Sequence, residues 1–326
     1  MVKDLRIWLF STLLLVFFLV LSSLVSVTST AYLVENKPIV VASTSVLASI
    51  VEDLAGDKVR VVYMVSPSMC PGHYDVKPGD VVTISEARLV LYHGFEPWVK
   101  ELIGAVNSTG SWNGSLVRIS GNWNTPDSLK KLYMKVAEAL KDSLGIDVSA
   151  RLEKCLKRID EVAEELKNIA RENSFEDKPV VVMLWQKPFV EYLGFKIVAT
   201  YGPPEKLSPK DISIIEENAT RNHAILVIDN MQSGTELGSK IARDIGAVHV
   251  VLINFPDSVP GVNNVTQMML YNAKLLAEAV HDYKYIAENT QLRSEVDLWR
   301  TVSIGLLVVA VVEALLIMLQ IRRGKK

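Results

Sequence analysis

The sequence has almost no net charge, little cysteine and no phosphate-binding loop. Its 326 residues carry 35 Lys and Arg against 37 Asp and Glu, a formal net charge of -2 without a long basic run. A nucleic-acid-binding protein is expected to carry a basic patch or run, so this charge distribution excludes that class of protein. Two cysteines, Cys70 and Cys155, allow at most one internal disulfide and exclude a four-thiolate zinc site. No Gly-x-x-x-x-Gly-Lys-Ser/Thr run is present, which excludes ATP binding through a phosphate loop.

The N-terminal segment has the pattern of a secretory signal. Lys3 and Arg6 precede the apolar stretch Ile7–Val20, which is followed by small and polar residues up to Ala31. The pattern predicts a signal peptide over residues 1–31. Because the apolar part is longer than usual, an uncleaved signal anchor is the alternative. Either form exports the rest of the chain, so we expect the main domain to be extracytoplasmic.

The C-terminal segment has the pattern of a transmembrane helix. Ser303–Ile321 is apolar apart from a few residues and is long enough to cross a hydrocarbon layer of about 30 Å. The basic tail at residues 322–326 predicts that this end stays in the cytoplasm. Glu313 lies inside the run, where an ionised carboxylate is costly, so a weak amphipathic tail helix is the alternative. We expect a protein of the cell membrane.

Between these ends, short β-branched runs alternate with helical patterns, which predicts an α/β fold with parallel-type sheets. The expected strands are Ile39–Ala42, Val59–Val65, Leu89–Tyr92, Leu116–Ile119, Val180–Leu184, Lys196–Thr200, Ala224–Ile228 and His249–Ile253. The alternation stops between Ser128 and Arg171, where two helical patterns are separated at Gly145. The second, Val148–Glu172, would be about 37 Å long and would cross a whole domain.

These patterns predict two α/β lobes joined by a long rigid helix. The lobes are residues 38–126 and 179–283, the linking helices are 127–178, and residues 284–302 form a stalk before the transmembrane helix. A ligand site is expected in the cleft between the lobes, near the carboxyl ends of the strands.

The segment Ser66–Asp80 is the strongest candidate for ligand contacts. It follows a predicted strand, is rich in proline and glycine, and presents a thiol, an imidazole and a carboxylate at Cys70, His73 and Asp75. A loop at the carboxyl end of a strand is where α/β proteins place ligand contacts.

Four segments resemble the zinc and manganese receptors that serve ABC importers. The resemblance is carried by His73–Asp80, Tyr92–Trp98, Leu207–Asp211 and Tyr271–Leu276, and it spans nearly all of residues 38–283. It implies two α/β lobes joined by a rigid helix, with His73 as a metal ligand. It also implies that the divalent metal, zinc or manganese, is the transported ligand and that the partners are an ABC permease and its ATPase subunit.

The other ligand positions of that family are altered in this sequence. The second falls on Gly121, two residues before Trp123; the third holds Gln186; and the fourth holds Asn254, with Asp257 three residues later. Amide carbonyls are weak donors for zinc, which prefers thiolate, imidazole and carboxylate. Cys70 could supply a thiolate three residues before His73, or it could be a small buried hydrophobic residue.

Two sets of candidate residues follow. The candidate metal ligands are His73, Cys70, Gln186, Asn254, Asp257 and Glu205, and the candidate cleft-lining residues are Tyr74, Asp75, Trp123 and Trp185. The altered positions leave open a receptor of the same fold for an organic or chelated solute. A Cys/His enzyme is the third reading, but the spacing of Cys70 and His73 gives no reason for an activated nucleophile. We expect a receptor and not an enzyme.

Overall fold

The computed structural model describes residues 8, 14–17, 37–110 and 112–323, but not the side chains of 109, 314–316 and 319–323. It divides into two units, residues 1–37 and Pro38–Lys326, and only the second holds the sheets. The predicted signal segment therefore lies largely outside the described residues. Its described pieces, residue 8 and residues 14–17, are helical.

The first sheet contains four parallel strands in the order β2-β1-β3-β4. The elements of this lobe are β1 (Ile39–Ala42), α2 (Ser45–Ala55), β2 (Arg60–Tyr63), the 3-10 helix η1 (Pro71–His73), α3 (Pro78–Glu86), β3 (Ala87–Tyr92), α4 (Trp98–Thr109) and β4 (Ser115–Arg118). Most residues of the inner strands β1 and β3 are buried Val, Leu and Ala, as expected for a sheet covered on both faces.

The second sheet repeats the same arrangement, with the parallel order β6-β5-β7-β8. Its elements are β5 (Pro179–Met183), η2 (Leu184–Gln186), α7 (Lys187–Tyr192), β6 (Lys196–Tyr201), η3 (Pro204–Lys206), α8 (Pro209–Arg221), β7 (Leu226–Asn230), η4 (Met231–Ser233), α9 (Glu236–Ile245) and β8 (Val248–Leu252). Helix α8 has a capping box at its N-terminus: the amide of Asp211 donates to Ser208 Oγ, and the amide of Ser208 donates to Asp211 Oδ2.

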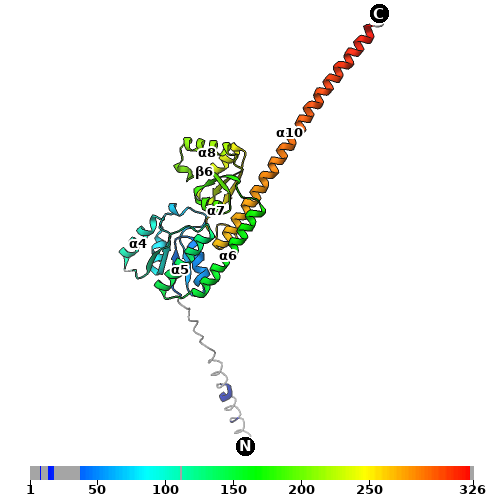
Figure 1. Cartoon of the computed structure of the whole chain (residues 1–326). Coiled ribbons are helices and arrows are strands. Elements are labelled where there is room, and N and C mark those ends of the chain that lie inside the picture. The colour runs from blue at the N-terminus through cyan, green and yellow to red at the C-terminus, as the bar shows by residue number, and fades with distance from the viewer. Residues whose placement is uncertain (1–7, 9–13, 18–36, 111, 324–326) are drawn as a thin grey trace. The chain divides into compact units, whose positions relative to one another are not determined.

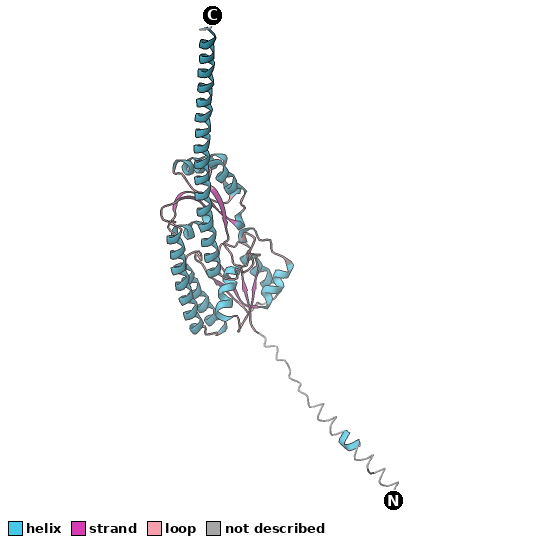
Figure 2. Ribbon diagram, turned by 90° about the vertical axis from the view of Figure 1, so that its right-hand side faces the viewer, coloured by secondary structure: helices cyan, strands magenta, loops and turns pink. Residues whose placement is uncertain are grey.

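Two helices connect the sheets in sequence, and a third follows them. They are α5 (Pro126–Leu144), α6 (Ser149–Glu172) and α10 (Val265–Arg323). Gly145 adopts a left-handed conformation with φ 67° and ends α5, which is the break that the sequence predicts. Figure 1 shows α6 beside the first part of α10, and Figure 2 shows α10 continuing past the strands.

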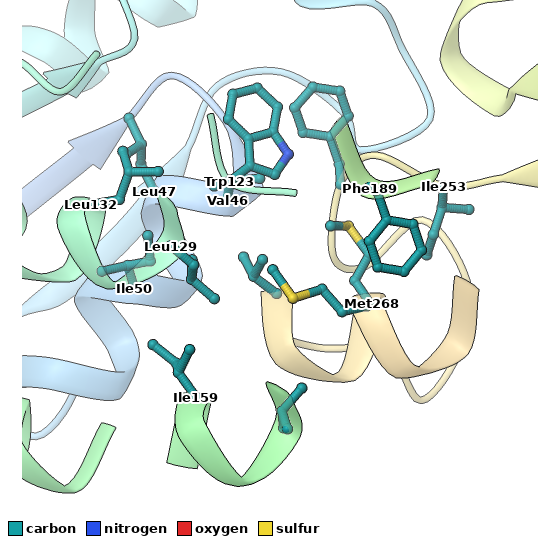
Figure 3. Close-up of a cluster of buried hydrophobic side chains, with 14 of the residues drawn as sticks. Val46, Leu47, Ile50, Trp123, Leu129, Leu132, Ile159, Phe189, Ile253 and Met268 are labelled. Atoms are coloured by element: carbon teal, nitrogen blue, oxygen red, sulfur yellow. The ribbon is translucent and has the colours of Figure 1, made fainter. Parts of the chain in front are cut away.

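One hydrophobic core extends through both lobes. Leu47 and Ile50 of α2 belong to the same buried cluster as Ile159 of α6, and so do Phe189 of α7 and Met268 of α10. Figure 3 shows these side chains facing one another across the helices. Two smaller clusters cover the outer faces, one under α3 and α4 and one under α8 and α9. Each sheet is therefore buried on both faces.

Two short helices were not expected from the sequence. Helix α3 begins inside the stretch that reads as a loop, with Pro78 at its first position and Asp80 Oδ2 accepting from the amide of Lys77 at 2.7 Å. Proline is tolerated there because the first helical N–H has no partner within the helix. Helix α7 follows β5 after the 3-10 helix η2, in a stretch where no helix was predicted.

The C-terminal prediction needs a correction. The expected domain helix, stalk and tail segment form one continuous helix of 59 residues, α10. Within the described part of the chain, no helix is both long enough and apolar enough to cross a membrane, so the structure does not support the transmembrane helix predicted at Ser303–Ile321. The side chains of residues 314–316 and 319–321 within that prediction lie outside those described.

Candidate functional site

The loop between β2 and α3 carries the predicted ligand residues, and we call Ser66–Lys77 the ligand loop. Two aromatic residues anchor it. Trp98 Nε1 donates to Pro71 O at 2.9 Å, and the rings of Tyr74 and Trp98 lie 4.9 Å apart. The Tyr74 hydroxyl donates to Asp80 Oδ2 at 2.9 Å, and burial followed by the Asp80 carboxylate raises the pKa of Tyr74 to about 12. The ligand loop is thus fixed on α3 and α4.

The structure brings together two of the predicted metal ligands. His73 ends η1, after β2 in the first lobe, and Glu205 lies in η3, after β6 in the second lobe. His73 Nε2 is 4.0 Å from Glu205 Oε1, and the two side chains are 73% and 53% exposed. An imidazole and a carboxylate that face each other across the lobes, both open to solvent, could bind one ion together.

Cys70 and Asp257 are placed less directly. Cys70 is a free, half-buried thiol that begins η1, and its carbonyl accepts from the amide of His73 at 3.0 Å. Asp257 lies near Glu52 of α2. Burial raises the pKa of both carboxyls, and the negative charges of Asp257 and Asp53 raise the pKa of Glu52 further. Among the described residues, no group of three or more His, Cys, Asp or Glu is arranged to hold a metal.

Gln186 and Asn254 belong to a buried cluster of side-chain amides between the lobes. Gln186 Nε2 donates to Asn230 Oδ1 at 3.1 Å and weakly to Ile253 O at 3.4 Å. Asn124, from the first lobe, donates through Nδ2 to Asn254 Oδ1 at 2.8 Å and to Trp185 O at 2.9 Å. The side-chain amide nitrogens of Gln186 and Asn124 are therefore engaged within the protein.

Two oxygens of this cluster have no donor among the described residues. They are Gln186 Oε1 and Asn124 Oδ1, both fully enclosed. A buried carbonyl without a donor costs about 1–3 kcal/mol. Because neither oxygen is accessible to solvent, a ligand with N–H or O–H donors, or a cation that prefers oxygen, could reach them only if the surrounding side chains or the lobes moved apart.

The two tryptophans predicted for the cleft differ in role. Trp123 is buried, donates through Nε1 to Asn254 O at 2.8 Å, and lies with its ring centroid 4.6 Å from that of His93. It packs between the lobes and ties them together. Trp185 is 46% exposed, so its ring is available to a ligand while its carbonyl holds Asn124. Asp75 is exposed on the ligand loop.

Sequence reasoning missed the residues that connect the ligand loop to the second lobe. Gln232 Nε2 donates to Pro67 O at 2.8 Å, and Ser258 Oγ donates to the same carbonyl at 3.0 Å. Ser45 Oγ, at the start of α2, donates to Pro256 O at 2.8 Å. The sequence could have identified these residues only by their positions close to the ends of predicted strands.

A buried His–Glu pair lies behind the site. His93 Nε2 is 2.9 Å from Thr44 Oγ1, while Glu96 accepts from the backbone amides of His93 and Gly94 at 3.0 and 2.7 Å. Burial lowers the pKa of His93 to about 4, and the Glu96 carboxylate opposes that shift. His93 thus remains neutral near pH 7 and supports the turn that follows β3.

Three comparisons with known proteins agree with this arrangement. An uncharacterized protein of Rickettsia prowazekii is 25% identical over 251 residues, which is 72% of this chain and 79% of that protein. The manganese ABC transporter substrate-binding lipoprotein PsaA of Streptococcus mitis is 31% identical over 109 residues, covering 33% of this chain and 29% of that protein. The periplasmic zinc-binding protein TroA of Treponema pallidum has the same fold, with a TM-score of 0.64 at 16% identity over 75% of this chain and 99% of that one.

A sequence model of a whole protein family matches as well. It is the model of the zinc-uptake complex component A, periplasmic, and it covers residues 40–279, which span both sheets, the ligand loop and the amide cluster. Since the match extends over well more than half of the chain, this protein belongs to the family of periplasmic zinc-uptake components.

Proposed function

We propose that this protein captures a divalent transition metal between its two lobes and delivers it to an ABC permease energised by a separate ATPase. The observation that carries the proposal is the pair His73 and Glu205, which meet from the two lobes at 4.0 Å. In the proposed site both side chains bind the ion. Cys70 and Asp75 are the further donors on the same ligand loop. The role is that of a receptor, without catalysis.

The donor set decides which metals fit this proposal. One imidazole and one carboxylate suit zinc and manganese, while a thiolate from Cys70 would favour zinc. Gln186 and Asn254 contribute through the amide cluster, where the free Gln186 Oε1 is a hard oxygen donor better suited to manganese. Asp257 is left outside the proposed ligand set because it lies beside Glu52.

The test is metal binding by the full chain, with Zn²⁺ and Mn²⁺ titrated against a chromophoric chelator. We expect His73→Ala and Glu205→Gln each to weaken binding by at least about tenfold, because each removes one of few protein donors. His281→Ala and Glu138→Gln are matched controls, since both residues are exposed and lie on α10 and α5. Unchanged affinity in both His73→Ala and Glu205→Gln would refute the site.

The free oxygens of Gln186 and Asn124 favour a second candidate, a receptor of the same fold for an organic or chelated solute. Such a ligand would donate N–H or O–H groups to these oxygens and could stack on the exposed ring of Trp185. Native mass spectrometry of the purified chain separates the candidates. An organic mass that is retained by His73→Ala and lost in Gln186→Leu would favour the second candidate.

Export and membrane attachment complete the proposal. Support comes from the sequence alone: the signal-like segment at residues 1–31, and the apolar run Ser303–Ile321 with its basic tail, several of whose side chains lie outside those described. This run would hold the chain at the membrane with its lobes outside. Alkaline carbonate extraction should leave the full chain in the membrane fraction. Intact-mass measurement decides whether the N-terminal segment has been removed. If a chain that has lost residues 1–31 is extracted into the soluble fraction, the anchor at Ser303–Ile321 is wrong.

A further inference from the structure

The middle part of α10 carries an apolar stripe that none of the described residues covers. Its members recur at alternating spacings of four and three residues, and they are Tyr285, Asn289, Leu292, Val296 and Trp299. We call these five residues the stalk face. The four apolar side chains are 64%, 59%, 65% and 68% exposed in chain order, and Asn289 is half-buried. These values are high for large apolar side chains on one helical face.

The spacing is that of a coiled-coil seam. Alternating steps of four and three place Asn289 and Val296 at the a positions of a heptad, and Tyr285, Leu292 and Trp299 at the d positions. A polar Asn at one a position fixes the register and the oligomeric state of such a seam, at a cost in stability. The stalk face therefore has the features of a short two-stranded coiled coil.

The charges beside the stalk face are arranged for a second copy of the same helix. Glu288 and Glu295 occupy the g positions, and Arg293 and Arg300 occupy the e positions. In a parallel pair in register, each Glu faces the Arg five residues further along the other helix, so every flanking pair is attractive. In an antiparallel pair, Glu would face Glu and Arg would face Arg. The pattern selects the parallel orientation.

The stalk face also points away from the second lobe. A shallow groove lies between α10 and the turn at Gly246 that joins α9 to β8, and Ile286, Ala287, Thr290 and Ser294 are among its lining residues. None of the five stalk-face residues lines this groove, whereas Glu295, which flanks the stalk face, lies at its edge and is among the lining residues. At 3.6 residues per turn, the groove side and the stalk face lie on nearly opposite sides of the helix. A second helix can therefore reach the stalk face without displacing the lobe.

We propose that this protein forms a parallel homodimer through the stalk face of α10, with Glu288 of one copy opposite Arg293 of the other and Glu295 opposite Arg300. The proposal does not depend on which ligand the lobes bind. It requires only that α10 is helical through residues 285–299 and that two copies share one orientation.

Disulfide trapping of the full chain in detergent micelles and in liposomes tests the geometry. In a chain whose Cys70 and Cys155 are replaced by Ser and Ala, Val296→Cys should give a covalent homodimer under mild oxidation. Leu298→Cys is the matched control, because it is equally apolar and exposed, at 62% against 65%, but lies off the stalk face. We expect at least a fivefold higher dimer yield from Val296→Cys.

Three results of the trapping experiment would overturn the proposal. Equal yields from the two positions would indicate association through another segment. No dimer from Val296→Cys would exclude the pair. A covalent product of Val296→Cys with a different protein in native membranes would assign the stalk face to another partner.

Charge reversal tests the orientation. Glu288→Arg with Glu295→Arg makes all four flanking charges positive, and Arg293→Glu with Arg300→Glu makes them all negative. We expect each double variant to lose the homodimer, and a mixture of the two to recover a heterodimer, measured by light scattering and by trapping through Val296→Cys. Homodimers that persist in both double variants would refute the proposed ion pairs.

Discussion

Acid should destabilise this protein partly through one buried imidazole, that of His93. Burial lowers its pKa from the ordinary 6.5 to about 4, with the Glu96 carboxylate acting in the opposite direction. The unfolded chain therefore takes up a proton near pH 6.5, whereas the folded chain takes it up only near pH 4. The contribution of neutral His93 to the free energy of unfolding is fully present above pH 6.5 and is lost as the pH falls toward 4.

The size of the effect follows from those two values. Between pH 7 and pH 5 the unfolded state gains about three-quarters of a proton at His93, while the folded state gains about a tenth of one. Integration of that difference gives a loss of about 2 kcal/mol in the free energy of unfolding. Glu52, Asp53 and Asp257 act with the opposite sign, because their raised pKa values stabilise the folded chain as the pH falls. Only a comparison of variants isolates the contribution of His93.

The variant is His93→Gln, which keeps a polar group within reach of Thr44 Oγ1 but cannot be protonated. It loses the ring contact with Trp123, so its stability at pH 7 should be lower than that of the parent. Its further loss between pH 7 and pH 5 should be about 2 kcal/mol smaller. The assay is urea unfolding followed by tryptophan fluorescence, with excess chelator to remove metal linkage.

His281→Gln is the control for the His93 experiment, because His281 is an exposed histidine on α10 and should keep the parental pH dependence. If His93→Gln lost as much stability on acidification as the parent, the imidazole would not be the acid-sensitive group. The reasoning from burial would then be refuted.

Two further predictions concern packing. Gly238→Ala should lower the free energy of unfolding by about 1–3 kcal/mol, because the added methyl would collide with the buried Asp229 carboxylate. Gly104→Ala in α4 meets open space and should raise the free energy of unfolding by up to about 1 kcal/mol. Equal melting temperatures of the two variants would contradict this prediction. Trp123→Phe should cost about 1–3 kcal/mol, because Asn254 O loses its buried donor between the lobes, and a parental melting temperature would show that this bond contributes nothing.

The strands and the long helices were predictable from the sequence because their patterns are local. Runs such as Ile39–Ala42 are β-branched and bounded by polar residues, and the structure places a strand at those same residues. The apolar period from Leu152 to Leu166 likewise predicts α6 within a residue at its start. Helix α3 was missed because Pro78 and Gly79 read as a turn, although proline suits the first position of a helix.

The candidate site was less predictable, because its contacts join distant parts of the chain. His73 and Glu205 were named in one set of candidate ligands, but no local pattern predicts that these two side chains meet. Contacts between side-chain amides are harder still to predict, because Asn and Gln are uncharged and follow no characteristic spacing in the sequence. Nothing near Asn124 in the sequence indicates that its side chain would bond to Asn254, 130 residues later.

Because α10 is one continuous helix, a small rotation at one end displaces its other end by a larger distance. Asn272 on α10 accepts from the amide of Ile253 and donates to its carbonyl, directly beside Asn254 of the amide cluster. From Asn272 to Ser303 the helix runs about 46 Å at 1.5 Å per residue. A rotation of about 5° at Asn272 would move the helix axis at Ser303 by about 4 Å. Small changes in how the lobes meet would therefore be magnified at the far end of the helix, where a neighbouring protein could detect them.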